Sequence, residues 1–163
     1  LGDTLESVLR TLARTPRGAT IDWDLECPAG VLVAMPAEDL TELLGNLLEN
    51  ASKWARSRVR IRVAGPDESH ADPIELRVED DGPGVPPESL GALGQRGLRL
   101  DERTQGSGLG LAIAQDICDA YGSTLRFGTA TLGGLAVTLC MPRPPDSAAA
   151  PGTRPAPGAR ALS

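Results

Sequence analysis

The polar side chains between residues 37 and 55 could bind a metal ion and phosphate. In a helix at about 100° per residue, Glu42, Asn46, Glu49, Asn50 and Lys53 share one face, and leucines occupy the other. Asparagine is unfavourable inside a helix, yet Asn46 and Asn50 are spaced i, i+4 and Lys53 continues the stripe. Amide oxygens are hard ligands that suit Mg²⁺, and an ammonium is a point charge for phosphate. A solvated face of an amphipathic helix is the alternative.

A strand that runs into Asp80-Asp81-Gly82-Pro83-Gly84 could bind a flat ligand. Glycines allow a backbone to approach such a ligand closely. An Asp at the end of a strand can accept a hydrogen bond from an exocyclic amine, which is what recognition of adenine requires. Taken alone, the segment could also be an ordinary turn.

Gly106, Gly108 and Gly110 alternate at the expected start of a helix, with Leu109 between the last two. Backbone N–H groups at a helix start attract anions. A dinucleotide-binding fingerprint would need a preceding strand, whereas a polar loop precedes here. The Gly-Lys-Ser/Thr of a Walker motif is absent from this segment. The glycines therefore predict a phosphate loop of another kind.

Several basic and amide side chains between the two glycine segments could close over a triphosphate as a lid. They are Gln95, Arg96, Arg99, Arg103 and Gln105. A loop as long as 80–110 is typical of a functional or mobile segment in a compact domain. For any one of these arginines, a solvated loop position is the alternative.

The helices and strands expected around these residues predict an α+β two-layer sandwich. In this fold, helices cover one face of a mixed, mostly antiparallel sheet. Apolar spacing predicts helices at 1–13, 37–55 and 111–121. Alternation predicts about six strands, at 21–25, 31–35, 59–63, 74–78, 125–127 and 135–141. The strands at 59–63 and 74–78 are expected to form a hairpin, the first with a basic outer face.

Composition excludes several classes of function. With 163 residues and a net charge of −6, the chain fits one domain and is not a general binder of polyanions. Aromatic residues at 2% argue against a nucleic-acid module based on stacking. No apolar run approaches the ~18 residues that span a bilayer. Because the sequence starts at Leu1 rather than Met, we interpret it as a fragment.

The cysteines and the single histidine offer no catalytic pair. Cys27, Cys118 and Cys140 are odd in number and widely spaced, which predicts three buried thiols in a reducing compartment rather than disulfides or a metal site. His70 falls in a polar stretch and is expected to be a solvated loop residue.

Together, the order and spacing of these segments resemble the ATP-binding catalytic domain of bacterial sensor histidine kinases, in the superfamily shared with gyrase, Hsp90 and MutL. Residues 46–53 resemble its N box, 80–84 its G1 box and 106–110 its G2 box, and Gly133-Gly134 also fits. The resemblance covers about residues 20–142. Residues 96–101 are similar to the branch that responds to magnesium and cationic peptides, although Leu93 and Leu98 replace the usual phenylalanine motif of the lid.

The resemblance implies Mg²⁺ and phosphate contacts for the polar residues. Asn50 would ligate Mg²⁺ through its side-chain oxygen, with Asn46 assisting. Lys53 would contact phosphate. Arg96 and Arg99 would lie near the γ-phosphate of ATP.

The resemblance also implies how the base and the triphosphate are bound. Asp80 would bind the adenine amino group, in a pocket shaped by Gly82 and Gly84. The residues of the G2 box would bring backbone amides to the phosphates. These residues are Gly106, Gly108, Leu109 and Gly110.

At the level of the whole protein, the resemblance implies a kinase that transfers the γ-phosphoryl group of ATP to a histidine on an adjoining dimerisation domain, for relay to the receiver domain of a response regulator. Residues 1–16 would end the helix of that domain, 17–142 would form the ATP-binding domain, and 143–163 would be a disordered Pro/Ala-rich tail. The acceptor histidine would lie outside this chain. The parent would be a homodimer in the bacterial inner membrane, with this domain in the cytoplasm and no nucleic-acid partner.

Other enzymes of the superfamily are the main alternatives. Gyrase- and Hsp90-type ATPases carry a Glu four residues before the Mg²⁺-binding Asn, as a base for water, whereas this position here is the amide Asn46. That residue favours the kinase. A regulatory module that binds nucleotide without transfer is disfavoured because all the ATP-binding segments are present, and an anti-sigma serine kinase usually lacks the leading helix.

Overall fold

The computed structural model describes residues 1–64, 73–94 and 109–144. Within them, five strands form one sheet in the order β1-β2-β3-β5-β4. The strands are β1 Asp22–Glu26, β2 Arg58–Ala64, β3 Ile74–Asp80, β4 Thr124–Thr129 and β5 Leu135–Met141. The helices are α1 Gly2–Leu12, α2 Ala37–Trp54, α3 Pro87–Leu90 and α4 Gly110–Ala120, with a 3₁₀ turn at Gly18–Thr20.

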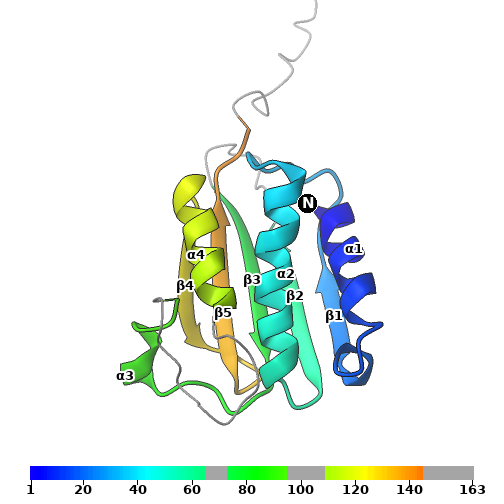
Figure 1. Ribbon diagram of the computed structural model, residues 1–163, viewed down its shortest axis with the longest axis vertical. Coiled ribbons are helices and arrows are strands. Elements are labelled where there is room, and N and C mark those ends of the chain that lie inside the picture. The colour runs from blue at the N-terminus through cyan, green and yellow to red at the C-terminus, as the bar shows by residue number, and fades with distance from the viewer. Residues whose placement is uncertain (65–72, 95–108, 145–163) are drawn as a thin grey trace, which may run out of the picture.

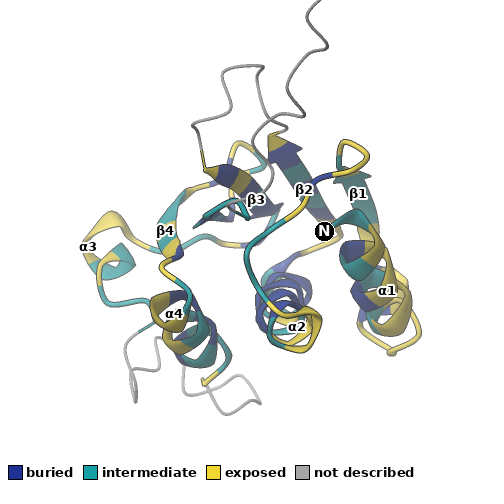
Figure 2. Ribbon diagram, turned by 90° about the horizontal axis from the view of Figure 1, so that it is seen from above, coloured by how far each residue is buried: buried dark blue, intermediate teal, exposed yellow. Residues whose placement is uncertain are grey.

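The predicted two-layer α+β architecture is confirmed. Helices α1, α2 and α4 lie side by side on one face of the sheet (Figures 1 and 2). β1 and β2 pair in parallel, and the other neighbouring strands are antiparallel. The parallel pair requires a crossover connection, and α2 is that crossover.

Helix α2 supplies much of the core. Leu43, Leu44 and Leu48 have no exposed surface, because Leu44 and Leu48 are spaced i, i+4 and Leu43 adjoins them on the same apolar face of the helix. The opposite side of α2 stays at the surface, where Asn50 and Lys53 are half-buried. The predicted division of this helix into an apolar and a polar face is therefore confirmed.

Helix α1 packs into the same core. Leu5 is fully buried and Val8 is nearly so. The turn after α1 is tight, since a Cβ on Gly18 would lie 1.9 Å from the carbonyl oxygen of Leu12. Arg17 in that turn donates hydrogen bonds to the carbonyl oxygens of Ser52 and Ala55. The segment between α1 and β1 therefore caps the C-terminal end of α2.

The sheet face away from the helices carries paired charges. Acidic residues of β1 stand opposite arginines of β2 in register. Asp24 lies 2.8 Å from Arg62 and also contacts Arg58 and Arg60. The hydrogen bond from Arg62 is the main reason why the pKa of Asp24 is lowered. The predicted basic outer face of β2 is thus confirmed, and its charges are neutralised by β1.

Two local predictions are wrong. Residues 31–35 form no strand: Ala34 donates one backbone hydrogen bond to Pro142, and proline has no N–H to return one. The described sheet therefore has five strands rather than about six. The short helix α3 lies within residues 80–110, for which a long loop with little periodicity is predicted.

The thiols also differ from prediction. All three cysteines are free, as expected, but only Cys118 is buried, whereas Cys27 and Cys140 are half-buried. His70 and nearly all of the predicted tail at 143–163 fall outside the described residues. Among the helices that are described, none has both the length and the apolar character needed to cross a membrane.

Substitution of Leu5 tests whether α1 is part of this folding unit. Leu5→Ala removes a fully buried side chain and should lower the free energy of unfolding by about 2–5 kcal/mol, as measured by urea denaturation. Leu32→Ala, at a position 62% exposed, should change it by less than about 0.5 kcal/mol. Equal small effects from both variants would show that α1 does not stabilise the domain.

Candidate functional site

Three consecutive carboxylates lie at the end of β3. Side chains alternate between the faces of a strand, so Glu79 lies on the outer face of the sheet and Asp80 on the face that the helices cover. Both are buried, with 4% and 2% of their surface exposed. Asp81 follows the strand. Glu79 and Asp80 both contact the turn between β4 and β5, whereas Asp81 contacts the connection between α2 and β2.

Asp80, the residue predicted to bind adenine, is held by backbone groups. Its Oδ1 accepts hydrogen bonds from the N–H groups of Gly82 at 2.8 Å and Leu135 at 3.3 Å. Burial raises the pKa of Asp80, and these two hydrogen bonds oppose the increase. The orientation of the carboxylate is therefore fixed by its surroundings.

Glycines allow three segments of backbone to meet around Asp80. A Cβ on Gly134 would lie 2.0 Å from Oδ1 of Asp80, and one on Gly82 would lie 2.4 Å from the carbonyl oxygen of Trp54. Gly84 has φ +73° and would place a Cβ 3.2 Å from the carbonyl oxygen of Gly133. Side chains cannot be accommodated at Gly82 or Gly134 without movement of the backbone.

Glu79 holds the turn between β4 and β5 that carries Gly134. Its Oε1 accepts hydrogen bonds from the N–H of Thr131 at 2.8 Å and from Arg77 at 3.0 Å. Burial acts to raise the pKa of Glu79, but the hydrogen bonds from Thr131 and Arg77 outweigh it and leave the pKa lowered. Glu79 and Asp80 therefore fix the same turn from opposite faces of the sheet.

Asp81 binds the connection between α2 and β2. Its Oδ1 accepts hydrogen bonds from the N–H groups of Arg56, Ser57 and Arg58 at 2.7, 3.0 and 3.1 Å, and its Oδ2 accepts one from the Ser57 hydroxyl at 2.8 Å. Partial burial acts to raise the pKa of Asp81, but these hydrogen bonds outweigh it and lower the pKa to about 2. The carboxylate is therefore charged at neutral pH.

The start of α4 lies against the polar face of α2. A Cβ on Gly110, the first residue of α4, would lie 3.3 Å from Oδ1 of Asn46. Asn46 is itself oriented by a hydrogen bond from Nδ2 to the carbonyl oxygen of Glu42 at 2.9 Å. Gly110 is the first residue of α4, and the first N–H groups of a helix have no partner within that helix. The predicted phosphate loop thus ends beside the predicted metal ligands.

Two further contacts involve residues of α2. Tyr121, just after α4, donates a hydrogen bond to Asp39 in the first turn of α2, and this bond is the main cause of the raised pKa of Tyr121. Near the other end, the ammonium of Lys53 lies over the ring of Trp54, 5.3 Å from its centroid. The lysine predicted to contact phosphate therefore makes a cation–π interaction.

The structure brings together part of the predicted site. Asp80, Gly82 and Gly84 meet at the end of β3, and Asn46 meets Gly110. The other predicted residues of the lid and the glycine loop lie outside the described residues, and they are Gln95, Arg96, Arg99, Arg103, Gln105, Gly106 and Gly108.

Sequence reasoning missed Glu79 and Asp81 and gave Gly134 no role of its own. A signal was present for the carboxylates, since three acidic residues in a row repel one another unless each has its own partners. The signal for Gly134 was the glycine pair before β5.

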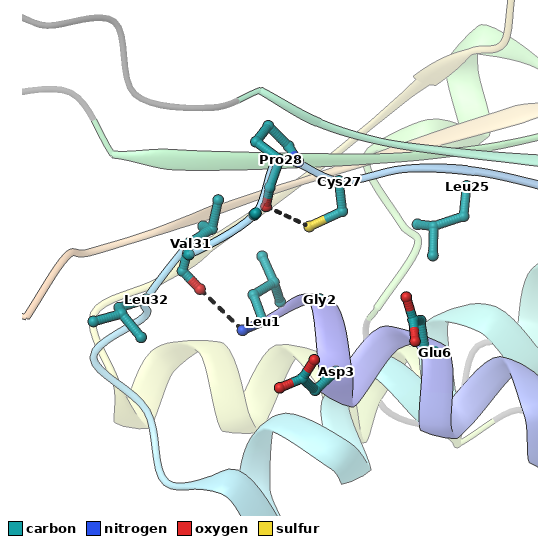
Figure 3. Close-up of a pocket in the computed structure, with 11 residues that line it drawn as sticks. Leu1, Gly2, Asp3, Glu6, Leu25, Cys27, Pro28, Val31 and Leu32 are labelled. Carbon is teal, nitrogen blue, oxygen red and sulfur yellow. Dashed lines mark hydrogen bonds between the residues drawn. The ribbon is translucent and has the colours of Figure 1, made fainter.

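A cavity of about 400 Å³ lies at a different place (Figure 3). The first residues of α1 and the loop 27–32 line it. Its edges are joined by a hydrogen bond of 3.0 Å from the backbone nitrogen of Leu1 to the carbonyl oxygen of Val31. Figure 1 places the N-terminus near the start of α2, whereas Lys53 is at the other end of that helix. Of the predicted site residues that the structure describes, none lines this cavity.

Comparison with known proteins gives consistent matches. Residues 35–145 match the family described as histidine kinase-, DNA gyrase B- and HSP90-like ATPase. The sensor protein kinase CarS of Pseudomonas aeruginosa is 43% identical over 140 residues, which are 86% of this chain and 30% of CarS. The sensor protein PhoQ of Escherichia coli K12 is 35% identical over 141 residues, 86% of this chain and 28% of PhoQ. The chain thus spans about 30% of the length of these relatives.

Solved structures agree with the fold. A mycobacterial sensor histidine kinase, MprB, superposes with a TM-score of 0.73 at 27% identity, covering 87% of this chain and 95% of that one. The catalytic domain of the histidine kinase ThkA superposes with a TM-score of 0.75 at 22% identity, covering 88% and 92%.

A methyl group at Gly134 should disrupt the predicted base pocket. Gly134→Ala places a carbon 2.0 Å from Oδ1 of Asp80, so we expect the free energy of unfolding to fall by about 1–3 kcal/mol and nucleotide affinity to fall with it, by calorimetry. The control is Gly45→Ala on α2, where nothing lies within 4 Å; it should stabilise the helix by about 0.5–1 kcal/mol. Unchanged affinity in Gly134→Ala would contradict this account of the pocket.

Proposed function

We propose that this chain, which belongs to the family of histidine kinase-, DNA gyrase B- and HSP90-like ATPases, donates the γ-phosphoryl group of ATP to a histidine on an adjoining helical domain. Its relatives and its fold make it the ATP-binding catalytic domain of a sensor histidine kinase. The observation that best supports the proposal is that both glycine segments contact α2. Gly82 lies against Trp54 at its end, and Gly110 lies against Asn46 in its middle.

This arrangement supports a binding mode in which the adenine and the triphosphate of ATP occupy two different parts of the site. The adenine amine would donate to the buried carboxylate of Asp80, whose Oδ1 already takes the N–H groups of Gly82 and Leu135. A guanine presents a carbonyl there, and a buried carboxylate without a donor is costly. The site should therefore prefer ATP to GTP.

The triphosphate would extend from the base toward α2 and the start of α4. Asn50 and Asn46 offer amide oxygens, which fit the hard-ligand preference of Mg²⁺, and the ion would neutralise charge on the phosphates. Lys53 would leave the ring of Trp54 to contact phosphate. The N–H groups at the start of α4 would bind phosphate oxygens. The solved structure of ShkA, which is 25% identical to this chain, is in complex with AMPPNP and supports nucleotide binding by this fold.

The identity of residue 46 supports transfer rather than hydrolysis. Asn46 is an amide and cannot take a proton from water at neutral pH. Glu49, one residue before Asn50, is exposed on α2 and is expected to point away from the γ-phosphate. We therefore assign this domain the role of positioning ATP for a nucleophile that another domain supplies.

The remaining parts of the proposal concern the parent protein. It would be a homodimer anchored in the inner membrane, with this domain on the cytoplasmic side, and a receiver domain of a response regulator would take the phosphoryl group from the histidine. Residues 1–16 would form the end of the dimerisation helix, although Leu5 is buried here against the ATP-binding domain. Arg96 and Arg99 would serve the γ-phosphate, and Gly106 and Gly108 the phosphate loop.

Removal of the amide at position 50 should abolish the effect of Mg²⁺ on binding. We expect Asn50→Ala to lose most of the gain in ATP affinity that Mg²⁺ gives, roughly tenfold or more, with little change in stability, because the side chain is off the apolar face of α2. Calorimetry with and without Mg²⁺ measures this. Glu49 is an exposed neighbour of Asn50, and Glu49→Ala should show the same Mg²⁺ dependence of ATP affinity as the unaltered chain. An Asn50→Ala variant with undiminished Mg²⁺ dependence would exclude Asn50 as a ligand.

The reaction itself can be followed with ATP labelled at the γ-phosphate. Alone, the chain should bind ATP at micromolar to millimolar strength, about 4–8 kcal/mol, without appreciable turnover. Addition of the separately purified histidine-bearing domain of the parent should give slow labelling of that domain. Turnover of ATP by the chain alone at roughly 1 s⁻¹ or faster, abolished by Glu49→Gln, would instead show an ATPase.

A further inference from the structure

We propose that Asp81 is a positioning residue for nucleotide binding, which locks the base-binding end of β3 to the end of the metal-binding helix α2. The inference rests on the proposed function, since it concerns how two parts of that site act on one ligand. Asp81 itself is not expected to touch ATP. Its role would be to keep the adenine subsite and the Mg²⁺–phosphate subsite at a fixed distance.

The contacts of Asp81 lie almost wholly on one short segment. Its carboxylate accepts hydrogen bonds from three consecutive backbone N–H groups, those of Arg56, Ser57 and Arg58, and from the Ser57 hydroxyl. Its own N–H donates to the carbonyl oxygen of Arg58 at 3.2 Å. Both carboxylate oxygens are thus engaged with the α2–β2 connection.

This segment directly follows the ligand-binding part of α2. Lys53 lies three residues before Arg56, and Asn50 lies one helical turn before Lys53. On the other side, Asp81 is the chain neighbour of Asp80. Gly82 completes the junction, because a Cβ there would lie 2.4 Å from the carbonyl oxygen of Trp54. Among the described residues, no other charged side chain accepts hydrogen bonds from the backbone N–H groups of Arg56 and Ser57.

Fixed spacing has a measurable effect when one ligand bridges two subsites. Binding of the first half of the ligand brings the second half to its subsite at an effective concentration that depends on how well the subsites are held in place. A looser junction leaves the affinity for each half unchanged and lowers the affinity for the whole. A residue that only stabilises the fold would not change the relation between these affinities.

The experiment uses three probes: adenosine, Mg²⁺-tripolyphosphate and Mg²⁺-ATP. Their dissociation constants are measured by NMR titration for the unaltered chain, Asp81→Ala and Asp81→Asn, at a temperature where circular dichroism shows each to be folded. Adenosine and Mg²⁺-tripolyphosphate are the two fragments of the ligand. The product of their dissociation constants, divided by the dissociation constant of Mg²⁺-ATP, gives the effective concentration. We expect it to fall about tenfold in Asp81→Ala, with fragment affinities unchanged. The fall should be smaller in Asp81→Asn, whose amide oxygen still accepts N–H groups.

Asp24→Ala is the matched control, because Asp24 also binds several partners but lies on the outer face of the sheet. It should leave the effective concentration unchanged. The inference is overturned if the Asp81 variants keep that value, or if they lose affinity for adenosine and Mg²⁺-ATP in equal proportion. If Asp81→Ala does not fold, the comparison of Asp81→Asn with the unaltered chain decides. Failure of the unaltered chain to bind Mg²⁺-ATP would refute the proposed function instead.

Discussion

The carboxylate of Asp80 is buried at a point where segments of backbone pack closely around it. A buried charge is tolerated only if its oxygens find hydrogen-bond donors, and here the donors are the N–H groups of Gly82 and Leu135. They can approach because Gly134 has no side chain. Much of the fold follows from this requirement, since the β4–β5 turn, the segment after β3 and the end of α2 must all converge on one residue.

Helix α2 links that point to the rest of the molecule. It is the crossover between the parallel strands β1 and β2, and its leucines fill the core. A helix with so much buried surface cannot shift without disturbing the sheet. In the proposed function, this rigidity would hold the side chains of Asn46 and Asn50 in place before Mg²⁺ and ATP bind. Arg17 adds a polar contact near the C-terminal end of α2 and Tyr121 one in its first turn, and Asp81 bonds to the residues that follow the helix.

The sequence was a good guide wherever a period was strong. The spacing of leucines in α2 and the alternation in β2 and β3 specified both the elements and their buried faces. The strand predicted at 31–35 failed because apolar residues alone do not make a strand: a partner with free N–H groups is also needed, and Pro142 lacks one. The roles of Glu79, Asp81 and Gly134 depend on contacts with residues that are distant in the chain, at Thr131, Ser57 and Asp80. Such pairings leave no periodic trace in a single sequence.

The topology has a consequence for the connection between β3 and β4, which contains positions 95–108. The neighbour of β3 in the sheet is β5, not β4, so α3, α4 and β4 all intervene before that pairing is completed. The entropy lost on closing a loop increases only with the logarithm of its length, by about 0.6 kcal/mol for each doubling. A change in length between Gly94 and Leu109 therefore alters the entropic cost of pairing β3 with β5 by only a fraction of a kcal/mol. The order of strands in this sheet is thus compatible with many lengths of that connection.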